Sequence, residues 1–170
     1  MATSTREAMI RHLDEELSRT RRTLERVPDD RWNWAPHEKS MPMGRLATHI
    51  ATLAVMVPGV LTTEVLDITD RRANSPTVER AADLVPVCEE LYGQAREALV
   101  KARDDDMDVS WAFMAGPNPI APPMPRYAAL TTFFFDHLIH HRAQLGVYLR
   151  LCGIPVPSIY GPSADEGFPS

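Results

Sequence analysis

The chain has 170 residues, of which 44% are hydrophobic and 24% are charged, a balance typical of folded globular proteins. This length suits a single domain, which we expect to span residues 1–170. The formal net charge of -5 argues against a nucleic-acid-binding protein, because such proteins need a clustered basic face.

The first residues, MATSTREAMIRHLDEEL, do not combine a basic start with an apolar stretch, so we expect no secretory signal and a cytoplasmic location. The most apolar long window, GRLATHIATLAVMVPGVL, contains Arg45 and His49 and is interrupted at Pro58. This favours a core helix, and we expect no membrane partner. Cys88 and Cys152 are too far apart in sequence for a metal knuckle and too few for a disulfide framework, so we interpret both as ordinary thiols.

The N-terminal part predicts one amphipathic helix and a loop. Residues 5–26 carry apolar side chains at helical spacing among charged ones, and Pro28 follows as a helix breaker. The next segment contains prolines and no sustained period. We expect its Trp32 and Trp34 to close one end of the core.

A second helix is predicted to begin near Ser40, a suitable N-cap, with Pro42 in its first turn. Its apolar residues recur at helical spacing as far as Pro58, and residues 60–69 could extend it beyond a kink. A polar turn, RRANSP, is expected to separate it from the third helix.

The C-terminal half predicts two further helices and a long loop. A helical pattern covers residues 87–99, with Pro86 near its first turn, and the clearest helix of the chain covers residues 126–151 and stops at Gly153. Between them, Asp104–Pro125 is rich in aspartate, proline and glycine without periodicity, which predicts a long loop.

Four helices without a convincing strand pattern indicate an all-α protein. The simplest way to bury four apolar helix faces is a four-helix bundle with long connections.

Three histidines lie close together in the segment FFFDHLIHHRAQL, residues 133–145. Residues four apart on a helix share a face, so His137 and His141 should point together toward the core, whereas His140 should lie at the edge of that face. His49 occupies the inward face of the second helix. These three imidazoles could hold one zinc-like ion and leave a fourth coordination position open.

A metal-free interpretation stays open at this point, because a buried histidine is most often a hydrogen-bonded structural residue. A third alternative is a stress-induced protein that binds metal without catalysing a reaction. The residues alone do not separate these possibilities.

Two stretches, PHEKSMPMGRLATHIATL and FFFDHLIHHRAQLGVYLRLCGIPVPSIYGPSADE, resemble the DinB/YfiT-like superfamily of damage-inducible, metal-dependent proteins. The resemblance spans nearly the whole chain. It implies an antiparallel four-helix bundle, often dimeric, so we expect a homodimer. It also implies a nickel or zinc ion bound by one histidine of the second helix and two of the last helix, which here are His49, His137 and His141.

The same resemblance implies an activity. Some relatives look like enzymes that use a low-molecular-weight thiol, transferring bacillithiol or mycothiol to electrophiles or isomerising maleylpyruvate. The expected function is therefore a metal-dependent thiol S-transferase or a related hydrolase-like enzyme acting on a small molecule. The catalytic residues and the substrate stay open.

The sequence also predicts roles for other residues near the histidines. Gln144 and Tyr148 share the predicted inward face and could orient a ligand histidine or substrate, or simply pack in the core. Arg142 should point away from that face, toward a salt bridge or a dimer contact, and His37 should lie at the surface. We expect the 104–125 loop and the proline-rich tail to shape access to the site.

Overall fold

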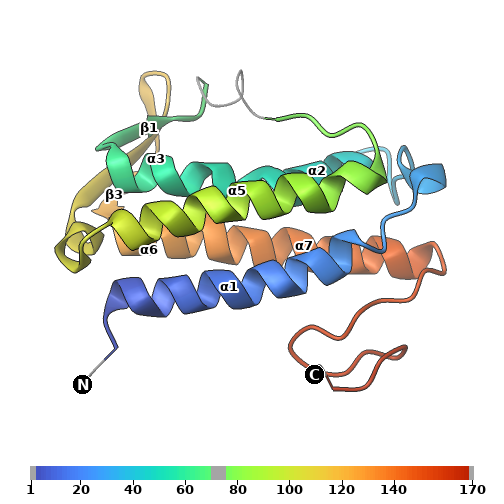
Figure 1. Ribbon diagram of the computed structural model, residues 1–170. Helices are drawn as coiled ribbons and strands as arrows, with labels where there is room; N and C mark the ends of the chain where they lie inside the picture. Colours follow the sequence, from blue (N-terminus) through green and yellow to red (C-terminus); the bar gives the residue numbers. More distant parts are fainter. Residues whose placement is uncertain (1–2, 70–75, 169–170) are drawn as a thin grey trace.

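The computed structural model describes residues 3–69 and 76–168, and in it four helical rods lie side by side (Figure 1). Their bounds are α1 Thr5–Leu24; α2 Met43–Thr52, a 3-10 turn Leu53–Val55 and α3 Met56–Thr62; α5 Ala81–Lys101; and α6 Arg126–Leu130, a π-helical turn Thr131–Asp136 and α7 His137–Leu151. The α1 and α7 rods run in one direction, and α2 and α5 run in the other. Each of α1 and α2 packs against both α5 and α7, so every rod has an antiparallel neighbour. The predicted all-α four-helix bundle is confirmed.

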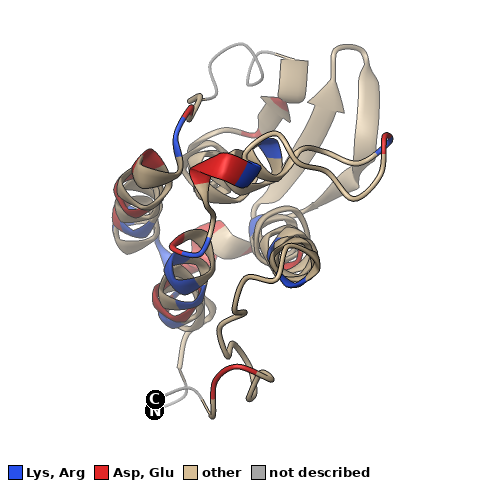
Figure 2. Cartoon of the chain, turned by 90° about the vertical axis from the view of Figure 1, so that its right-hand side faces the viewer, with Lys and Arg blue, Asp and Glu red and all other residues tan. Residues whose placement is uncertain are grey.

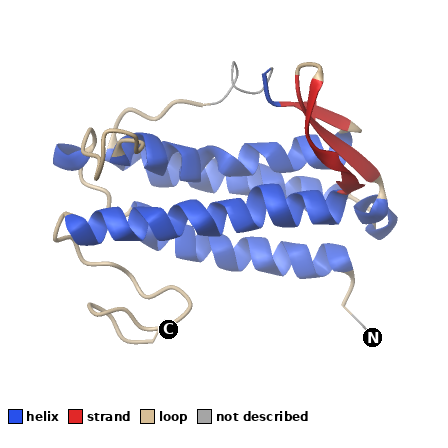
Figure 3. Cartoon of the chain, turned by 180° about the vertical axis from the view of Figure 1, so that it is seen from behind, coloured by secondary structure: helices blue, strands red, loops and turns tan. Residues whose placement is uncertain are grey.

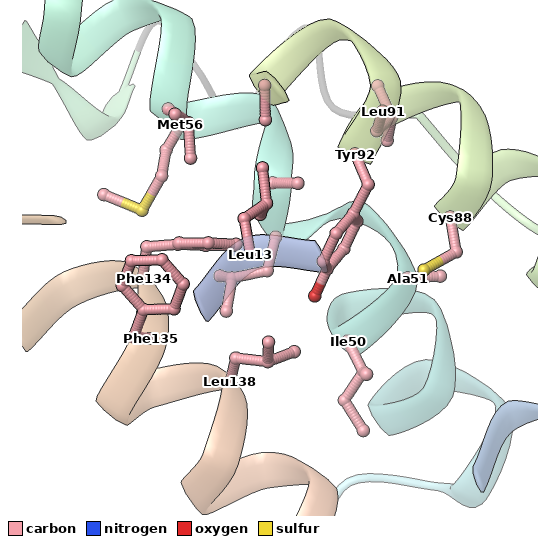
Figure 4. Close-up of a cluster of buried hydrophobic side chains, with 14 of the residues drawn as sticks. Leu13, Ile50, Ala51, Met56, Cys88, Leu91, Tyr92, Phe134, Phe135 and Leu138 are labelled. Carbon is pink, nitrogen blue, oxygen red and sulfur yellow. The ribbon is translucent and has the colours of Figure 1, made fainter. Parts of the chain in front are cut away.

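Side chains from all four rods form one hydrophobic core (Figure 4). Leu13 comes from α1, Ile50 from α2, Tyr92 from α5, and Phe134 and Leu138 from the last rod, and each is at most 1% exposed. Such burial contributes roughly 1.5–3 kcal/mol for each large apolar side chain, and it explains why four amphipathic segments assemble.

Local signals in the sequence set the ends of two rods. At the start of α1 the Ser4 hydroxyl accepts the N–H of Glu7, whose carboxylate accepts the N–H of Ser4, a capping box. At the end of α7 the N–H groups of Gly153 and Ile154 bind the carbonyls of the last turn. Gly153 has φ 72°, a conformation that favours glycine, so the predicted stop is confirmed.

The start of α2 differs from the prediction. The helix begins at Met43 instead of near Ser40, and backbone carbonyls of the preceding loop replace a side-chain cap. The N–H of Met43 donates to the Trp34 carbonyl and the N–H of Gly44 donates to the Trp32 carbonyl, both at 2.8 Å. The loop between α1 and α2 is thereby fixed to the end of the bundle.

Gly44 allows this close packing because the Trp32 indole lies where a side chain would be. A Cβ atom at Gly44 would come within 2.2 Å of the ring. Gly44→Ala should therefore displace Trp32 and lower the free energy of unfolding by about 1–3 kcal/mol, measured by urea denaturation. Gly93→Ala is the matched control, since a Cβ there meets nothing within 4 Å and should stabilise α5 by roughly 0.5–1 kcal/mol. Equal effects of the two substitutions would contradict this packing argument.

The prediction of a loop over residues 104–125 is wrong. A 3-10 turn, Asp104–Asp108, is followed by strand β2, Ser110–Ala115, and strand β3, Asn118–Pro125, which pair antiparallel. Strand β1, Val65–Asp67, pairs parallel with β2, and the small sheet covers one end of the bundle (Figure 3). The hairpin strands carry no charged residue, as Figure 2 shows. The prolines of β3 interrupt the alternating pattern that predicts a strand. An edge strand tolerates them, because fewer of its N–H groups must donate to a neighbouring strand.

The segment after Pro58 also differs from the prediction. The helix continues through Pro58 but ends at Thr62, and strand β1 replaces the proposed helical extension to residue 69. The third helix starts at Ala81, so Pro86 lies in its second turn and not its first. Most of the predicted RRANSP turn lies outside the described residues.

The rod from Met43 to Thr62 is, by length and mean hydropathy alone, apolar enough to cross a bilayer. Within the fold, however, 67% of that window is buried against the other rods. This is the pattern of a core helix in a globular protein, as the sequence predicted.

Candidate metal site

The three predicted ligand histidines come together between α2 and α7. The Nε2 atoms of His49 and His137 are 3.3 Å apart, and those of His137 and His141 are 2.7 Å apart. One ligand atom from each ring fits within a mutual distance of 4.8 Å. All three side chains are half-buried, so they are shielded from bulk water without being sealed from it.

These distances suit a shared divalent cation. Two nitrogens bound to one tetrahedral zinc ion, each about 2.0–2.1 Å from it, lie about 3.4 Å apart, close to the separation of His49 and His137. The His137–His141 pair would have to open by less than about 1 Å, which small rotations of the rings within one rotamer can supply. The donor set and its spacing therefore fit a metal ion such as zinc or nickel.

Gln144 determines which nitrogen of His141 is free to bind a metal. Its Oε1 lies 2.8 Å from Nδ1 of His141, and its Nε2 lies 3.0 Å from Nε2 of His140. An amide oxygen only accepts, so Nδ1 of His141 carries the hydrogen and its Nε2 presents a lone pair to the cluster. Burial lowers the pKa of His141 below its ordinary value of 6.5, although the Gln144 bond opposes this, so the ring is neutral at pH 7.

Gln144→Ala should therefore weaken metal binding by about 10–100-fold, because the His141 ring loses the partner that fixes its tautomer and orientation. Competition with a chromogenic chelator measures the affinity. Gln94→Ala, on the exposed face of α5, is the control and should leave the affinity unchanged. An unchanged affinity in the Gln144 variant would show that the amide does not support the site.

The helix that carries two of the histidines is not regular throughout. The π-helical turn directly precedes His137, and the extra residue turns everything after it by about 100°. His137, His141, Gln144 and Tyr148 do share a face, since α7 itself is regular. Leu145 is fully buried and lies on the neighbouring face with Leu138 and Leu149.

Arg142 points away from the histidine face, as predicted, and it is buried against α1. Its side chain is 3% exposed and its Nη1 lies 2.6 Å from Oε2 of Glu16, which is 0% exposed. The helix α7 packs against both α1 and α2, so two of its faces are enclosed. The histidine face meets α2, and Arg142, about 100° further round, meets α1. The predicted salt bridge is present.

The buried pair Glu16 and Arg142 belongs to a larger network that reaches the surface at Tyr160. Arg19 donates to Glu16 at 2.7 Å, the Tyr160 hydroxyl donates to it at 2.8 Å, and Arg142 donates to the Tyr160 oxygen at 2.9 Å. Burial alone would raise the pKa of Glu16, but the charge of Arg142 and these hydrogen bonds outweigh it and lower the pKa. The carboxylate is therefore ionised, and the network ties the C-terminal tail to α1 and α7.

The rest of the tail is fixed by two acidic residues. Glu166 forms ion pairs with Arg22 at 2.5 Å and Arg26 at 2.6 Å, and Asp165 pairs with Arg150. These contacts lie along α1 and the end of α7. In the sequence, these contacts are signalled by no more than the adjacent acidic residues Asp165 and Glu166 among turn-forming ones.

Two other segments lie next to the histidine face. Trp34 makes an edge contact with Tyr148, with ring centroids 5.6 Å apart, and the hairpin residue Phe113 packs on Phe133 at 5.0 Å, one turn before His137. The Trp34 loop therefore covers one end of this face. That the hairpin and the tail shape access stays a prediction.

The remaining candidates do not join the cluster. His37 is exposed, as predicted, and its Nδ1 accepts the N–H of Lys39. Cys88 is fully buried, and burial, together with the charge of Glu89, raises the pKa of its thiol to about 12. Cys88 therefore stays protonated at neutral pH and does not act as a nucleophile.

Comparison with known proteins agrees with this picture. The chain is 29% identical over 155 residues to the uncharacterized protein YrdA of Bacillus subtilis (strain 168), covering 89% of this chain and 85% of YrdA. Its fold is similar to a DinB-like protein from Bacillus cereus, with a TM-score of 0.72, 22% identity and coverage of 91% of this chain and 97% of that one. It is also similar to the DinB-like protein YjoA of Bacillus subtilis, with a TM-score of 0.66, 20% identity and coverage of 87% and 95%.

The sequence also matches the DinB family over residues 1–167, which includes all four rods and the three histidines. With this match and the bundle described above, the chain belongs to the DinB family.

Proposed function

We propose that this protein is a divalent-metal-dependent enzyme that transfers a low-molecular-weight thiol to a small electrophilic substrate. The observation that supports the proposal is the convergence of imidazole nitrogens from His49, His137 and His141. Three protein ligands are typical of catalytic zinc sites, whereas structural sites use four. Nickel or zinc is the proposed ion.

The residues of the site have separate tasks in this proposal. The three histidines would hold the cation, and Gln144 keeps the Nε2 lone pair of His141 directed at it. When bound, a divalent cation lowers the pKa of a thiol or water that occupies its open position, which makes that group nucleophilic at neutral pH. Neutral imidazoles leave the charge of the cation undiminished.

The nucleophile must come from a second substrate. The histidine cluster contains no cysteine, and Cys88 is buried and protonated. In the proposed reaction the S–H bond of the small thiol breaks and its proton passes to solvent. Sulfur then bonds to the electrophilic carbon, and the leaving group departs with the electron pair of its former bond. Small thiols are kept reduced in the cytoplasm, so a cytoplasmic location is part of the proposal.

A transfer assay tests the activity. Zinc- or nickel-loaded protein is mixed with chlorodinitrobenzene and, in separate runs, bacillithiol, mycothiol or glutathione. We expect at least one thiol to react well above the uncatalysed rate, and we expect chelation to remove the difference. His37→Ala, remote from the cluster, should keep the activity. Background rates with all three thiols on fully metal-loaded protein would favour a noncatalytic metal-binding protein.

A further inference from the structure

A cavity of about 270 Å³ lies at the start of α2, apart from the histidine cluster. Its walls come from the loop between α1 and α2, from α2 itself and from the segment before α5. The residues that line it include Trp32, Asn33, Gly44, Arg45, Thr48 and Val78. Taking about 30 Å³ for each water-sized group, the cavity has room for a ligand of roughly ten heavy atoms.

The charge of this cavity is positive. Arg45 is the one charged side chain among the described residues that line it, and it is exposed. Most arginines in the described part of the chain have an aspartate or glutamate partner within 4 Å, but Arg45 has none among those residues. Its guanidinium is thus available for a ligand, and its planar fork of donors matches a carboxylate.

The other walls suit the apolar body of a small organic molecule. The Trp32 indole lies flat over the backbone of Gly44, which gives a rigid aromatic wall. The Thr48 hydroxyl donates to the Val78 carbonyl at 3.4 Å and so holds the segment before α5 against α2. A pocket with apolar walls and one placed charge is the usual form of a small-ligand site.

The position of Arg45 relates this cavity to the metal site. Arg45 and His49 are four residues apart on the regular helix α2, so they lie about 6 Å apart along its axis and within about 40° of each other around it. A ligand whose charged end binds Arg45 can extend along this face toward the histidines.

We infer that this cavity binds the carboxylate end of a small organic acid, with Arg45 as its counter-ion and Trp32 against its apolar part. Interpreting that acid as the substrate of the enzyme rests on the proposed function. The preference for a carboxylate over a neutral ligand rests on the cavity alone.

Titration of ¹⁵N-labelled protein with benzoate, followed through the indole N–H signal of Trp32, tests the inference. Benzamide serves as the neutral ligand of equal shape, and ionic strength is held constant. We expect saturable binding of benzoate, with benzamide weaker by at least about tenfold, because hydrogen bonds between charged partners are stronger than those to a neutral amide. Arg45→Gln should lower the affinity for benzoate by a similar factor, and Arg45→Lys should lower it by less. Arg96→Gln, an arginine on the outer face of α5, should change nothing.

The same titrations on metal-free protein and on His49→Ala separate this inference from the proposed function. Benzoate binding that persists without metal and is weakened about tenfold in Arg45→Gln supports the inference, whatever the outcome of the transfer assay. Equal affinities for benzoate and benzamide would overturn it. So would benzoate binding that needs the metal and survives in Arg45→Gln, since the cation would then be the true partner of the carboxylate.

Discussion

His49→Ala is expected to abolish stoichiometric metal binding. The histidine is the one ligand from α2, so its loss leaves only the pair on α7, His137 and His141, which lies one turn apart on a single helix. Replacing a residue that only hydrogen-bonds to a metal-binding side chain lowers the metal affinity by about 10–100-fold. Loss of the metal-binding side chain itself should therefore lower the affinity by more than about 100-fold. Elemental analysis of protein purified without an affinity tag, after supplementation with nickel or zinc, measures the content directly.

His37→Ala is the matched control for this experiment, because His37 is an exposed histidine in a loop outside the cluster. It should bind metal as the unaltered protein does. Thermal unfolding gives a second measurement, since a ligand at 100 times its dissociation constant stabilises the folded state by about 2.7 kcal/mol. An unaltered protein that stays empty after supplementation would leave the histidines as structural residues.

Glu16→Gln should have the largest effect on stability. The substitution keeps the shape of the side chain but removes the charge that neutralises Arg142, whose guanidinium is 3% exposed. Breaking a buried ion pair by removing one partner costs about 3–5 kcal/mol, because the remaining charge is left uncompensated. We expect the free energy of unfolding, measured in urea, to fall by that amount.

Glu15→Gln provides the control, since Glu15 contacts the same Arg19 at 3.1 Å but is 61% exposed. Exposed pairs contribute about 0–1 kcal/mol, so this variant should be nearly as stable as the original. The double variant Glu16→Leu with Arg142→Met should recover part of the loss, because no buried charge of this pair is left unpaired. Similar effects of the Glu15 and Glu16 substitutions would show that the buried pair is not a major source of stability.

The ion pair also predicts a pH dependence. The pKa of Glu16 is lower in the folded protein than its ordinary value of 4.5. Its contribution to stability is therefore fully present above pH 4.5 and is lost as the pH falls through the lower, folded value. Acid titration of the unfolding free energy should show a smaller decrease in Glu16→Gln than in the unaltered protein.

Sequence periodicity identified the two histidine-bearing helices well. The spacing of His137 and His141 put both rings on one face, and the amphipathic pattern around His49 put that ring on the inward side of its helix. The structure brings all three together because α2 and α7 pack against each other. Gln144 was correctly placed beside them, since its position depends only on the regular helix after His137.

Predictions that assumed a regular helix or a simple composition rule were less successful. Arg142 was predicted to form a salt bridge or a dimer contact, but nothing in its own helix indicated that Glu16, 126 residues earlier, lies opposite it. The hairpin was missed because its prolines weaken the strand pattern, although they are acceptable at an edge. The π-helical turn before His137 has no clear sequence signal.

The sequence by itself determined the helical segments, their amphipathic faces, the caps at Ser4 and Gly153 and the ring pair on α7, because each depends on contacts within a few residues along the chain. The tertiary structure alone decided which faces meet, and so whether His49 reaches that pair, which carboxylate neutralises Arg142, and where the Trp32 loop forms an open pocket beside Arg45. Those outcomes depend on packing between segments far apart in sequence. Local periodicity carries no information about such partners.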